Sequence, residues 1–408
     1  MSGIDPHIIR KDFPILDQTI NGKPLIYFDN AATSQSPRQV MEASTHYYSH
    51  INSNIHRAAH KLAREATAAH EAARETISTH LNCAHAHELI FTSGTTDSIN
   101  LVSNTLALSG KISAGDKIII SALEHHANIV PWQMLCQRTG ASLEIIPIHE
   151  DGTFDMDAYQ GMLDESVKLV AISHVSNALG TVNPVSTIIS MAKQYDALVL
   201  VDGAQAAPHF NIDVQELNCD FYVFSGHKIY GPTGIGILYG KEQILNELPP
   251  WRGGGEMIKE VTFEHTTYND LPFKFEAGTP DIEGAIAMAA AIDYMNAIGL
   301  EKIAAHESYL EQKATAALKE INGIKLYGTA PQKAAVVSFR IEGIHHYDLG
   351  TLLDQMGVAV RTGHHCCQPL MARYGITGTV RASFAAYNTE QEVDAFIEAI
   401  HKATRMLS

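Results

Sequence analysis

Cysteine is scarce in this chain and follows no pattern. The 408 residues include five cysteines, and neither their odd number nor their spacing suits a disulfide framework. The chain does not open with a charged segment followed by an apolar one, and no uninterrupted apolar run approaches the ~20 residues that a membrane-spanning helix needs. These absences predict a cytoplasmic protein and argue against a secreted or membrane-embedded one.

Positive charge is also in short supply. The sequence has 29 lysine and arginine residues against 45 acidic ones, which gives a formal net charge of −16. Nucleic-acid binding needs a basic field to neutralise phosphates. The charge balance therefore argues against nucleic acid as the main partner, although it leaves room for local anion-binding pockets.

Repeats and low-complexity linkers are missing as well, and short apolar runs alternate instead with stretches of helical spacing. The expected strands lie at residues 116–120, 143–147, 169–173 and 198–201, separated by helical patterns such as 130–140, 156–163 and 188–195. This alternation predicts a doubly wound α/β fold with a mainly parallel sheet. Residues 221–224 and 236–238 flank a glycine-rich turn and predict an antiparallel addition to that sheet.

A different pattern begins at residue 282. Two helical stretches, 282–298 and 300–321, precede an α+β region with expected strands at 335–340, 358–361 and 380–383 and helices at 347–357 and 390–407. We therefore expect a large domain at residues 22–298. The smaller domain would combine residues 299–408 with an N-terminal arm at 1–21.

One lysine stands in an unusual place. The apolar run 221–224 ends in Ser225, Gly226 and His227, and Lys228 follows just before a turn rich in glycine and proline. A lysine held at a strand end by small neighbours can be desolvated, which lowers the pKa of its amine and lets it attack a carbonyl. A Schiff base with pyridoxal phosphate needs such an amine. A lone lysine is more often a surface residue, so this interpretation needs support from elsewhere in the chain.

Other expected strands end in polar groups that suit the same cofactor. Residues 93–100 open a helix whose free N–H groups would cradle an anion. His125 can stack on an aromatic ring, Asp202 can pair with a pyridine nitrogen, and Gln205 can donate to a phenolate oxygen. A helix cap, a loop histidine or a turn would explain each of these singly. Ligands, however, collect at the carboxyl ends of the strands in a doubly wound sheet.

Histidine and cysteine cluster at residues 364–367, shortly after Arg361. Neighbouring histidine and arginine lower the pKa of a thiol and supply thiolate. The alternative is a zinc site, which consecutive ligands fit poorly because structural sites usually space them by two or more residues. Arg381, on a following expected strand, can hold a substrate carboxylate in a bidentate pair.

Taken in order, these residues resemble the group II, SufS-type cysteine desulfurases, a branch of the class V, fold-type I pyridoxal phosphate enzymes. The resemblance covers essentially the whole chain. It implies a fold-type I transferase, with a large domain built on a mainly parallel, seven-stranded sheet and a smaller α+β C-terminal domain. Its motifs lie at residues 27–33, 54–57, 94–96, 124–132, 201–205, 225–228, 252–256, 275–280 and 361–366.

The resemblance also implies roles for single residues. Lys228 would hold the cofactor as a Schiff base, Cys366 would be the nucleophile, and His125 would stack on the ring and move protons. Asp202 would pair with the pyridine nitrogen and Gln205 with the phenolate oxygen. The phosphate would be bound by Thr95, Thr96, Ser225 and His227, with Thr279 reaching it from the second subunit of a homodimer, and the substrate carboxylate would be held by Asn177, Arg361 and Arg381.

The implied reaction converts L-cysteine to L-alanine and leaves a persulfide on Cys366. The persulfide would pass to an acceptor protein for iron–sulfur cluster assembly, with no metal in the active site. Tyr347 stands where enzymes served by the zinc-containing acceptor SufU carry histidine, which favours a SufE-like acceptor. Selenocysteine lyase activity would share every cofactor residue and is the main alternative, whereas an aminotransferase or a kynureninase-like enzyme needs no reactive cysteine loop.

Three positions depart from the family pattern. Ser93 stands where arginine is common, Ala58 where glycine is common, and Cys367 where alanine is usual. A second thiol beside the nucleophile could resolve a persulfide. Adjacent cysteines rarely form an unstrained disulfide, so we interpret Cys367 as a bystander.

Overall fold

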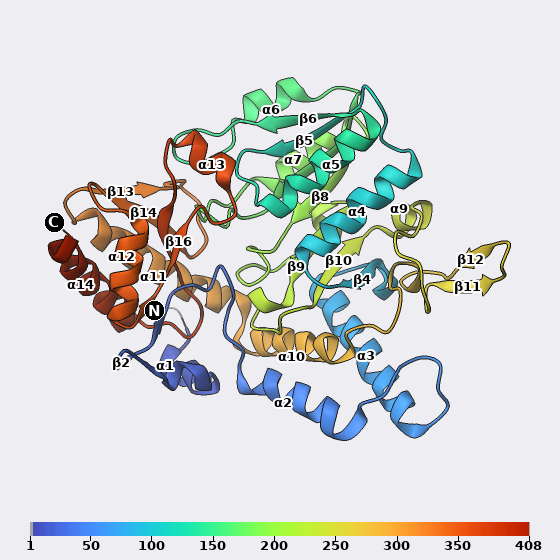
Figure 1. Ribbon diagram of the computed structural model, residues 1–408, viewed down its shortest axis with the longest axis horizontal. Coiled ribbons are helices and arrows are strands. Elements are labelled where there is room, and N and C mark those ends of the chain that lie inside the picture. Colours follow the sequence, from blue (N-terminus) through green and yellow to red (C-terminus); the bar gives the residue numbers. More distant parts are fainter. Residues whose placement is uncertain (1–2, 408) are drawn as a thin grey trace.

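The computed structural model describes residues 3–407. Figure 1 shows a sheet-centred body, a second α+β body at one end that carries the C-terminus, and a hairpin that projects at the opposite end. The hairpin consists of β11 (Ile258–Val261) and β12 (Thr266–Tyr268). Phe263 at its tip is fully exposed.

A seven-stranded sheet runs through the larger body in the order β4–β10–β9–β8–β7–β5–β6. β10 is antiparallel to both of its neighbours, and all the other pairs are parallel. The predicted α/β fold and its antiparallel addition are therefore confirmed. The strands are β4 (Leu89–Thr92), β5 (Lys117–Ser121), β6 (Ser142–Ile146), β7 (Val167–Ser173), β8 (Leu198–Asp202), β9 (Phe221–Ser225) and β10 (Gly236–Gly240).

Helices cover both faces of this sheet because successive side chains of its strands point alternately into two apolar cores. In β5, Ile118 and Ile120 pack with the core under α4 and α5, whereas Ile119 joins the core under α3, α7 and α10. A strand that is apolar on both sides belongs to a sheet buried on both faces. The covering helices are α3 (Lys61–His80), α4 (Thr95–Ser109), α5 (Val130–Thr139), α6 (Met156–Met162), α7 (Val185–Lys193), α8 (Val214–Leu217), α9 (Glu242–Glu247) and α10 (Ile282–Ile298), with α2 (Arg38–His46) packed on α10.

Local signals fix the ends of these helices. Asp281 caps α10, since its side chain accepts the N–H of Gly284, and α5 ends before Gly140, which takes a left-handed φ of 80°. The helical spacing predicted a helix at 188–195, but α7 begins earlier, directly after Pro184. A proline can precede the first turn of a helix but cannot continue one, so it marks this start. Shorter 3-10 segments are η1 (Arg10–Asp12), η2 (Pro14–Asp17), η4 (Ala86–Glu88), η5 (His126–Asn128), η6 (Gly226–Lys228) and η7 (Phe273–Phe275), and η3 (Tyr47–Ile51) is a π-helical turn.

A four-stranded antiparallel sheet organises the α+β body, in the order β13–β14–β17–β16. One prediction here is wrong, because residues 358–361 do not form a single strand. β15 (Val358–Ala359) pairs in parallel with β3 (Ile26–Tyr27), and the chain then joins the other sheet as β16 (Arg361–Gly363). The other elements are α11 (Leu300–Lys319), β13 (Ile324–Tyr327), β14 (Val336–Ile341), α12 (His346–Gln355), α13 (Gln368–Arg373), β17 (Thr379–Ser383) and α14 (Glu390–Leu407).

The N-terminal segment contacts both bodies. It contains α1 (Pro6–Ile9) and the paired strands β1 (Thr19–Ile20) and β2 (Lys23–Pro24). Phe13 packs in the core against Tyr294 of α10 and Tyr387, and Arg10 forms an ion pair with Glu392 of α14 at 2.7 Å. The expected division into residues 22–298 on one side and 1–21 with 299–408 on the other stays a prediction.

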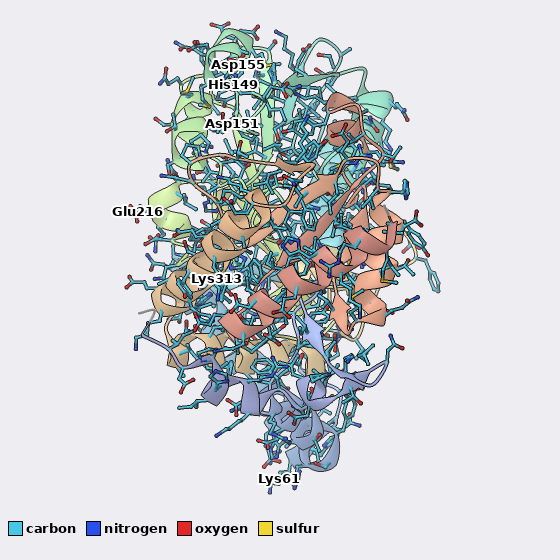
Figure 2. All side chains as sticks on the ribbon, turned by 90° about the vertical axis from the view of Figure 1, so that its left-hand side faces the viewer. Lys61, His149, Asp151, Asp155, Glu216 and Lys313 are labelled. Carbon is cyan, nitrogen blue, oxygen red and sulfur yellow. The ribbon has the colours of Figure 1, made fainter. Side chains whose placement is uncertain are left out.

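Charged side chains reach the outside of the molecule. Figure 2 shows Lys61 and Glu216 at its outline, and both are exposed. In the part of the chain that the structure describes, no helix combines the length and the apolar character that crossing a bilayer requires.

Candidate active site

The carboxyl ends of β4, β5, β7, β8 and β9 meet at one cavity of about 220 Å³. Parallel strands bring their carboxyl ends to the same edge of a sheet, so residues far apart in the sequence converge there. Of the predicted site residues, only Thr279 is absent from the lining, which contains Thr95, Thr96, His125, Asn177, Asp202, Gln205, Ser225, His227, Lys228, Arg361, Cys366 and Arg381. The remaining lining residues are His365, which belongs to the cluster noted at 364–367, and Ala31, Ala32, Ala127, Ser173, Val175 and Ala204, to which the sequence analysis gave no role.

Lys228 ends the 3-10 turn η6 and faces this cavity. Burial lowers the pKa of its amine, and the nearby Asp202 carboxylate only partly opposes that effect. Among residues 3–407, no hydrogen-bonding partner holds the Nζ atom. The amine is thus free for a reaction and is driven toward its neutral, nucleophilic form.

Asp202 ends β8 and is buried. One of its carboxylate oxygens accepts the N–H of Ala204 at 2.9 Å, and burial raises its pKa against the opposing effect of Lys228. The next residue must be glycine, because a Cβ on Gly203 would come within 2.1 Å of the Tyr222 ring. Gln205 donates one amide N–H to the carbonyl of Ala31 at 2.7 Å, which leaves its second N–H for the cavity.

The start of α4 forms the anion-binding part of the site. Gly94 precedes the helix with φ 138°, a conformation that suits glycine, and a Cβ there would approach Ser225 Oγ to 3.2 Å. The Thr95 N–H donates to Ser225 Oγ at 2.9 Å, and the two hydroxyl oxygens of these residues lie 2.8 Å apart. A helix start that carries N–H groups and hydroxyls in this way attracts a phosphate.

Two histidines of the cavity are neutral. His125 Nδ1 accepts the N–H of Ala127 at 3.0 Å, and burial, with a smaller effect from Lys228, lowers its pKa to about 3. Burial likewise lowers the pKa of His227 to about 4. A neutral, flat imidazole at the position of His125 can stack on an aromatic ring without the cost of burying a charge.

The two adjacent thiols have opposite environments. Cys366 is partly exposed and lines the cavity. Cys367 is fully buried, lies 3.0 Å from Asn177 Oδ1, and has a pKa that burial raises to about 12. Only Cys366 therefore combines access to the cavity with access to solvent, and Cys367 is held as a neutral thiol.

A group of arginines lies beside the thiols. Arg381 donates to the carbonyl of Asn177 at 2.8 Å and to Asp29 Oδ1 at 3.1 Å, and its buried Nε has no partner within residues 3–407. Arg361 lies 3.7 Å from Asp29 Oδ2. Asp29 thus joins both arginines, a role that the sequence analysis missed although an acid directly after the run Tyr27–Phe28 was visible.

Asn177 does not point freely into the cavity. Its Nδ2 donates to the carbonyl of His365 at 2.7 Å, and its Oδ1 accepts from Cys367 Sγ at 3.0 Å. Both ends of its amide therefore hold the loop that carries the thiols, which the sequence analysis did not foresee.

Thr279 lies in a different cavity of about 150 Å³, together with Ser93, Asp97 and Arg252. Arg252 pairs there with Asp97 at 2.6 Å. The predicted contact of Thr279 with a phosphate requires a second subunit and stays a prediction.

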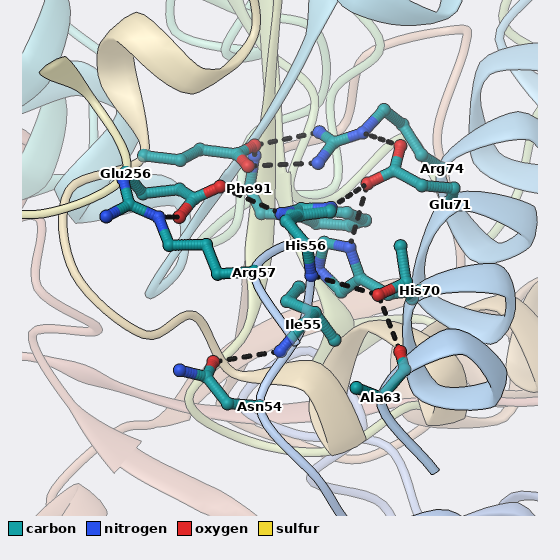
Figure 3. Close-up of polar contacts among 12 residues, drawn as sticks. Asn54, Ile55, His56, Arg57, Ala63, His70, Glu71, Arg74, Phe91 and Glu256 are labelled. Atoms are coloured by element: carbon teal, nitrogen blue, oxygen red, sulfur yellow. Dashed lines mark hydrogen bonds and ion pairs between the residues drawn. The ribbon is translucent and has the colours of Figure 1, made fainter. Parts of the chain in front are cut away.

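The consecutive histidines and cysteines do not form a metal-ligand group. Within the described residues, only His56, His70 and Glu71 bring their ligand atoms within 4.8 Å of one another. Figure 3 shows that these groups are already engaged, since His56 contacts Glu71 and Glu256 at 3.0 Å each and Arg74 contacts Glu71 at 3.2 Å. A network of contacts next to Arg74 thus engages His56, Glu71 and the Nδ1 atom of His70, whereas the buried Nε2 of His70 has no partner within residues 3–407.

The comparisons with known proteins agree with this geometry. The aminotransferase class-V family model matches residues 26–396. The chain therefore belongs to the class-V aminotransferase family, and the cofactor of that class, pyridoxal phosphate, is the one predicted.

Within that class, the similar proteins are cysteine desulfurases. The chain is 52% identical over 399 residues to the probable cysteine desulfurase of Xylella fastidiosa, which covers 98% of this chain and 95% of that protein. It is 51% identical over 400 residues to a cysteine desulfurase of Synechococcus elongatus, of whose length the match covers 64%. The crystal structure of the Escherichia coli cysteine desulfurase CsdA superposes with a TM-score of 0.92 at 39% identity, covering 99% of this chain and 100% of that one. These similarities confirm the predicted family.

The residues in the cavity fit the cofactor of this family. The helix start at Thr95 suits a phosphate, the buried Asp202 carboxylate suits a protonated ring nitrogen, and the Lys228 amine suits an aldehyde carbon. All three face one cavity.

Proposed function

We propose that this protein is a cysteine desulfurase that converts L-cysteine to L-alanine and carries the sulfur as a persulfide on Cys366. One observation supports this most directly. A desolvated lysine and a partly exposed cysteine line the same cavity, although 138 positions separate residues 228 and 366 in the chain. An amine for the cofactor and a thiol for the sulfur are the two groups that this reaction requires.

Different residues around the cavity would bind different parts of the cofactor. The cofactor phosphate would be held by Thr95, Thr96, Ser225 and His227, with the positive end of the α4 dipole behind them. Asp202 would hold the ring nitrogen, His125 would cover the ring and Gln205 would donate to the ring oxygen. Bound pyridoxal phosphate supplies an electron sink that lets an amino acid lose its α-proton.

The protein supplies the proton transfers and the thiolate. Neutral Lys228 accepts the proton from the substrate Cα, and Arg361 and Arg381 bind the substrate carboxylate, with Asn177 beside them. The Cys366 sulfur then attacks the sulfur of the substrate. The Cβ–S bond breaks, an S–S bond forms, and Cβ takes a proton together with the released electron pair. L-Cysteine and one protein thiol thus give L-alanine and one protein persulfide without an external oxidant.

One incubation tests this proposal. The holoenzyme and its Cys366→Ala variant are each given L-cysteine, and alanine and the mass of the peptide with residue 366 are measured. We expect alanine and one added sulfur atom on Cys366 in the wild type, and no added sulfur in the variant. Alanine without the sulfur adduct would contradict the role of Cys366. No alanine, even with an acceptor added, would contradict the function.

The same experiment with L-selenocysteine tests the alternative activity. Selenium is released more readily than sulfur, so a selenocysteine lyase would keep most of its activity in the Cys366→Ala variant. A desulfurase acting on L-cysteine would lose it. Comparing the two substrates in the two proteins separates the activities.

We further propose that the working enzyme is a homodimer in which Thr279 of one subunit reaches the cofactor phosphate of the other. Thr279 faces a cavity of its own beside Asp97 and Arg252, next to the segment that begins α4. A Thr279→Ala variant should stay dimeric in sedimentation and bind the cofactor more weakly.

The sulfur acceptor is proposed to be a SufE-like protein of the cytoplasm that delivers sulfur to iron–sulfur cluster assembly. Tyr347, which carries the argument for that acceptor, is 65% exposed on α12 and open to a partner. All five cysteines are free, which suits a reducing compartment. Stimulation by a SufE-type protein but not by a SufU-type one is the expected result.

A further inference from the structure

Two histidine rings flank the nucleophilic cysteine and contact each other. His126 belongs to η5 and His364 to the loop after β16, and their ring centroids lie 5.6 Å apart. His364 Nδ1 accepts the N–H of Cys366 at 3.0 Å, and His126 Nε2 accepts the N–H of Gln368 at 3.0 Å. The backbone N–H of His126 also donates to the carbonyl of Cys366 at 2.8 Å. These two histidines thus form hydrogen bonds with the backbone at Cys366 and at Gln368, on both sides of the thiol.

The loop needs such support because its backbone is unfavourable. His365 and Cys366 have φ values of 51° and 56°, so two consecutive residues with side chains adopt the left-handed conformation. That conformation costs a residue other than glycine about 1–2 kcal/mol. The loop would therefore relax to another shape unless hydrogen bonds outside it hold this one.

Two residues outside the loop support it: Asn177, which donates to the carbonyl of His365, and His126. His126 comes from a segment 240 positions earlier in the chain and bonds directly to Gln368, the first residue of α13. That N–H has no partner inside its own helix, so the imidazole acts as its cap. His364, by contrast, belongs to the loop itself.

The hydrogen bond from Gln368 exists only while His126 is neutral, because a protonated imidazole has no lone pair to offer. Burial lowers the pKa of His126, and His364 lowers it further. The titratable groups that face it are His364 from the opposite loop and His125 from its own segment, and both are bases. The surroundings thus favour the neutral ring that the contact requires.

We propose that His126 is a positioning residue of the reaction, whose neutral ring holds the Cys366 loop in the conformation that faces the cavity and whose protonation releases that loop. This inference rests on the proposed role of Cys366 as sulfur acceptor. It also predicts that sulfur transfer weakens in acid, through the position of the thiol as well as its ionisation.

Hydrogen exchange on the holoenzyme tests the contact without relying on activity. Two variants are compared with the wild type: His126→Leu, which removes the acceptor, and His126→Gln, whose amide oxygen replaces Nε2 at a similar reach and does not titrate. His401→Gln, at an exposed position on α14, is the matched control. The exchange of the Gln368 amide is measured at neutral pH and at lower pH, each corrected for the intrinsic rate.

In the His126→Leu variant, we expect the Gln368 amide to exchange at least about tenfold faster, since its hydrogen bond is lost. The His126→Gln variant should match the wild type at neutral pH and keep its protection in acid, where the wild type loses it. Unchanged protection in His126→Leu, or parallel loss in the wild type and His126→Gln, would overturn the proposal. If His126→Leu does not fold, the comparison of His126→Gln with the wild type in acid still tests the proposal.

Persulfide formation supplies the second measurement. In a single turnover with L-cysteine, we expect sulfur loading of Cys366 to fall at least about fivefold in His126→Leu and to recover in His126→Gln, while substrate binding changes little. A wild type that forms no alanine would disprove the proposed function, yet the exchange experiment would still report on the loop. Normal loading in His126→Leu despite a lost Gln368 contact would overturn the positioning role.

Discussion

The two sides of the cavity are built differently. One side, the sheet wall, consists of Thr95, His125, Asp202, Ser225 and Lys228, which stand at the ends of buried strands. The other side, the loop wall, is lined by Arg361, His365 and Cys366 and belongs to the segment 361–367 that extends from the smaller sheet. The sheet wall is fixed by strand pairing, whereas the loop wall depends on a few hydrogen bonds around a strained backbone.

This difference corresponds to two kinds of chemistry. A cofactor must be held in one orientation for proton transfer, which a rigid edge of parallel strands provides. A sulfur carrier must take sulfur inside the cavity and hand it over outside, so its thiol benefits from a loop that can move. The partial exposure of Cys366, against the full burial of Cys367 beside it, fits that need.

The largest expected effect comes from breaking the sheet wall at Lys228. A Lys228→Ala variant should lose alanine formation by at least about 10³-fold, because it removes both the proposed anchor of the cofactor and the proposed base for the α-proton. Alanine formation from L-cysteine is the measurement. Lys168→Ala, at a residue outside the cavity, is the control and should behave as the wild type, whereas substantial activity in Lys228→Ala would refute the assignment.

The two thiols of the loop wall provide the next comparison. Cys366→Ala should abolish protein-bound sulfur. Cys367→Ala should retain it within about twofold, because the buried thiol does not line the cavity and, among the described residues, bonds only to Asn177 and to the carbonyl of His365. Mass spectrometry of the loop peptide after incubation with L-cysteine measures both. Loss of persulfide in Cys367→Ala, with its thermal stability unchanged, would show that Cys367 takes part.

A weaker effect on the reaction is expected from changing Asp29, which pairs with the two arginines beside the cavity. An Asp29→Asn variant removes the charge that orients Arg361 and Arg381, and should raise the KM for L-cysteine about tenfold with a smaller change in kcat. Steady-state kinetics give both constants. A fall in kcat alone would mean that Asp29 acts on the reaction step instead of on substrate binding.

The smallest effect concerns acid stability at His227, which lies between Ser225 and Lys228 of the sheet wall. His227 has a folded-state pKa of about 4, below its ordinary value of 6.5, so the unfolded chain binds its proton first as the pH falls. Its contribution to stability is complete above pH 6.5 and is lost toward pH 4. Between neutral pH and about pH 5, the free energy of unfolding should therefore fall by about 1 kcal/mol less in His227→Asn than in the wild type.

Chemical denaturation at the two pH values measures that difference. The remaining loss in the variant is assigned to other buried histidines, such as His125 and His174, whose pKa values burial also lowers. Equal losses in the wild type and the variant would show that His227 titrates normally.

Much of the sheet wall could be predicted from the sequence. The alternation of apolar runs and helical patterns specified the parallel sheet, and polar residues directly after those runs marked its carboxyl edge, where Lys228, Asp202 and His125 now lie together. The prediction succeeds because strand pairing collects all carboxyl ends at one edge whatever the loops between them do. The helix start at Thr95 follows from the same rule.

The loop wall was decided only by the tertiary structure. The sequence could not show that Cys366 faces the cavity while Cys367 is buried, that Asn177 binds the loop, that Asp29 joins two arginines, or that residues 358–361 divide between two sheets. Each of these depends on a contact between segments far apart in the chain, or on a left-handed φ at residues that ordinarily avoid it. Local sequence patterns specify strands and helices because those elements form from neighbouring residues, whereas the direction of a loop side chain is set by what packs against it.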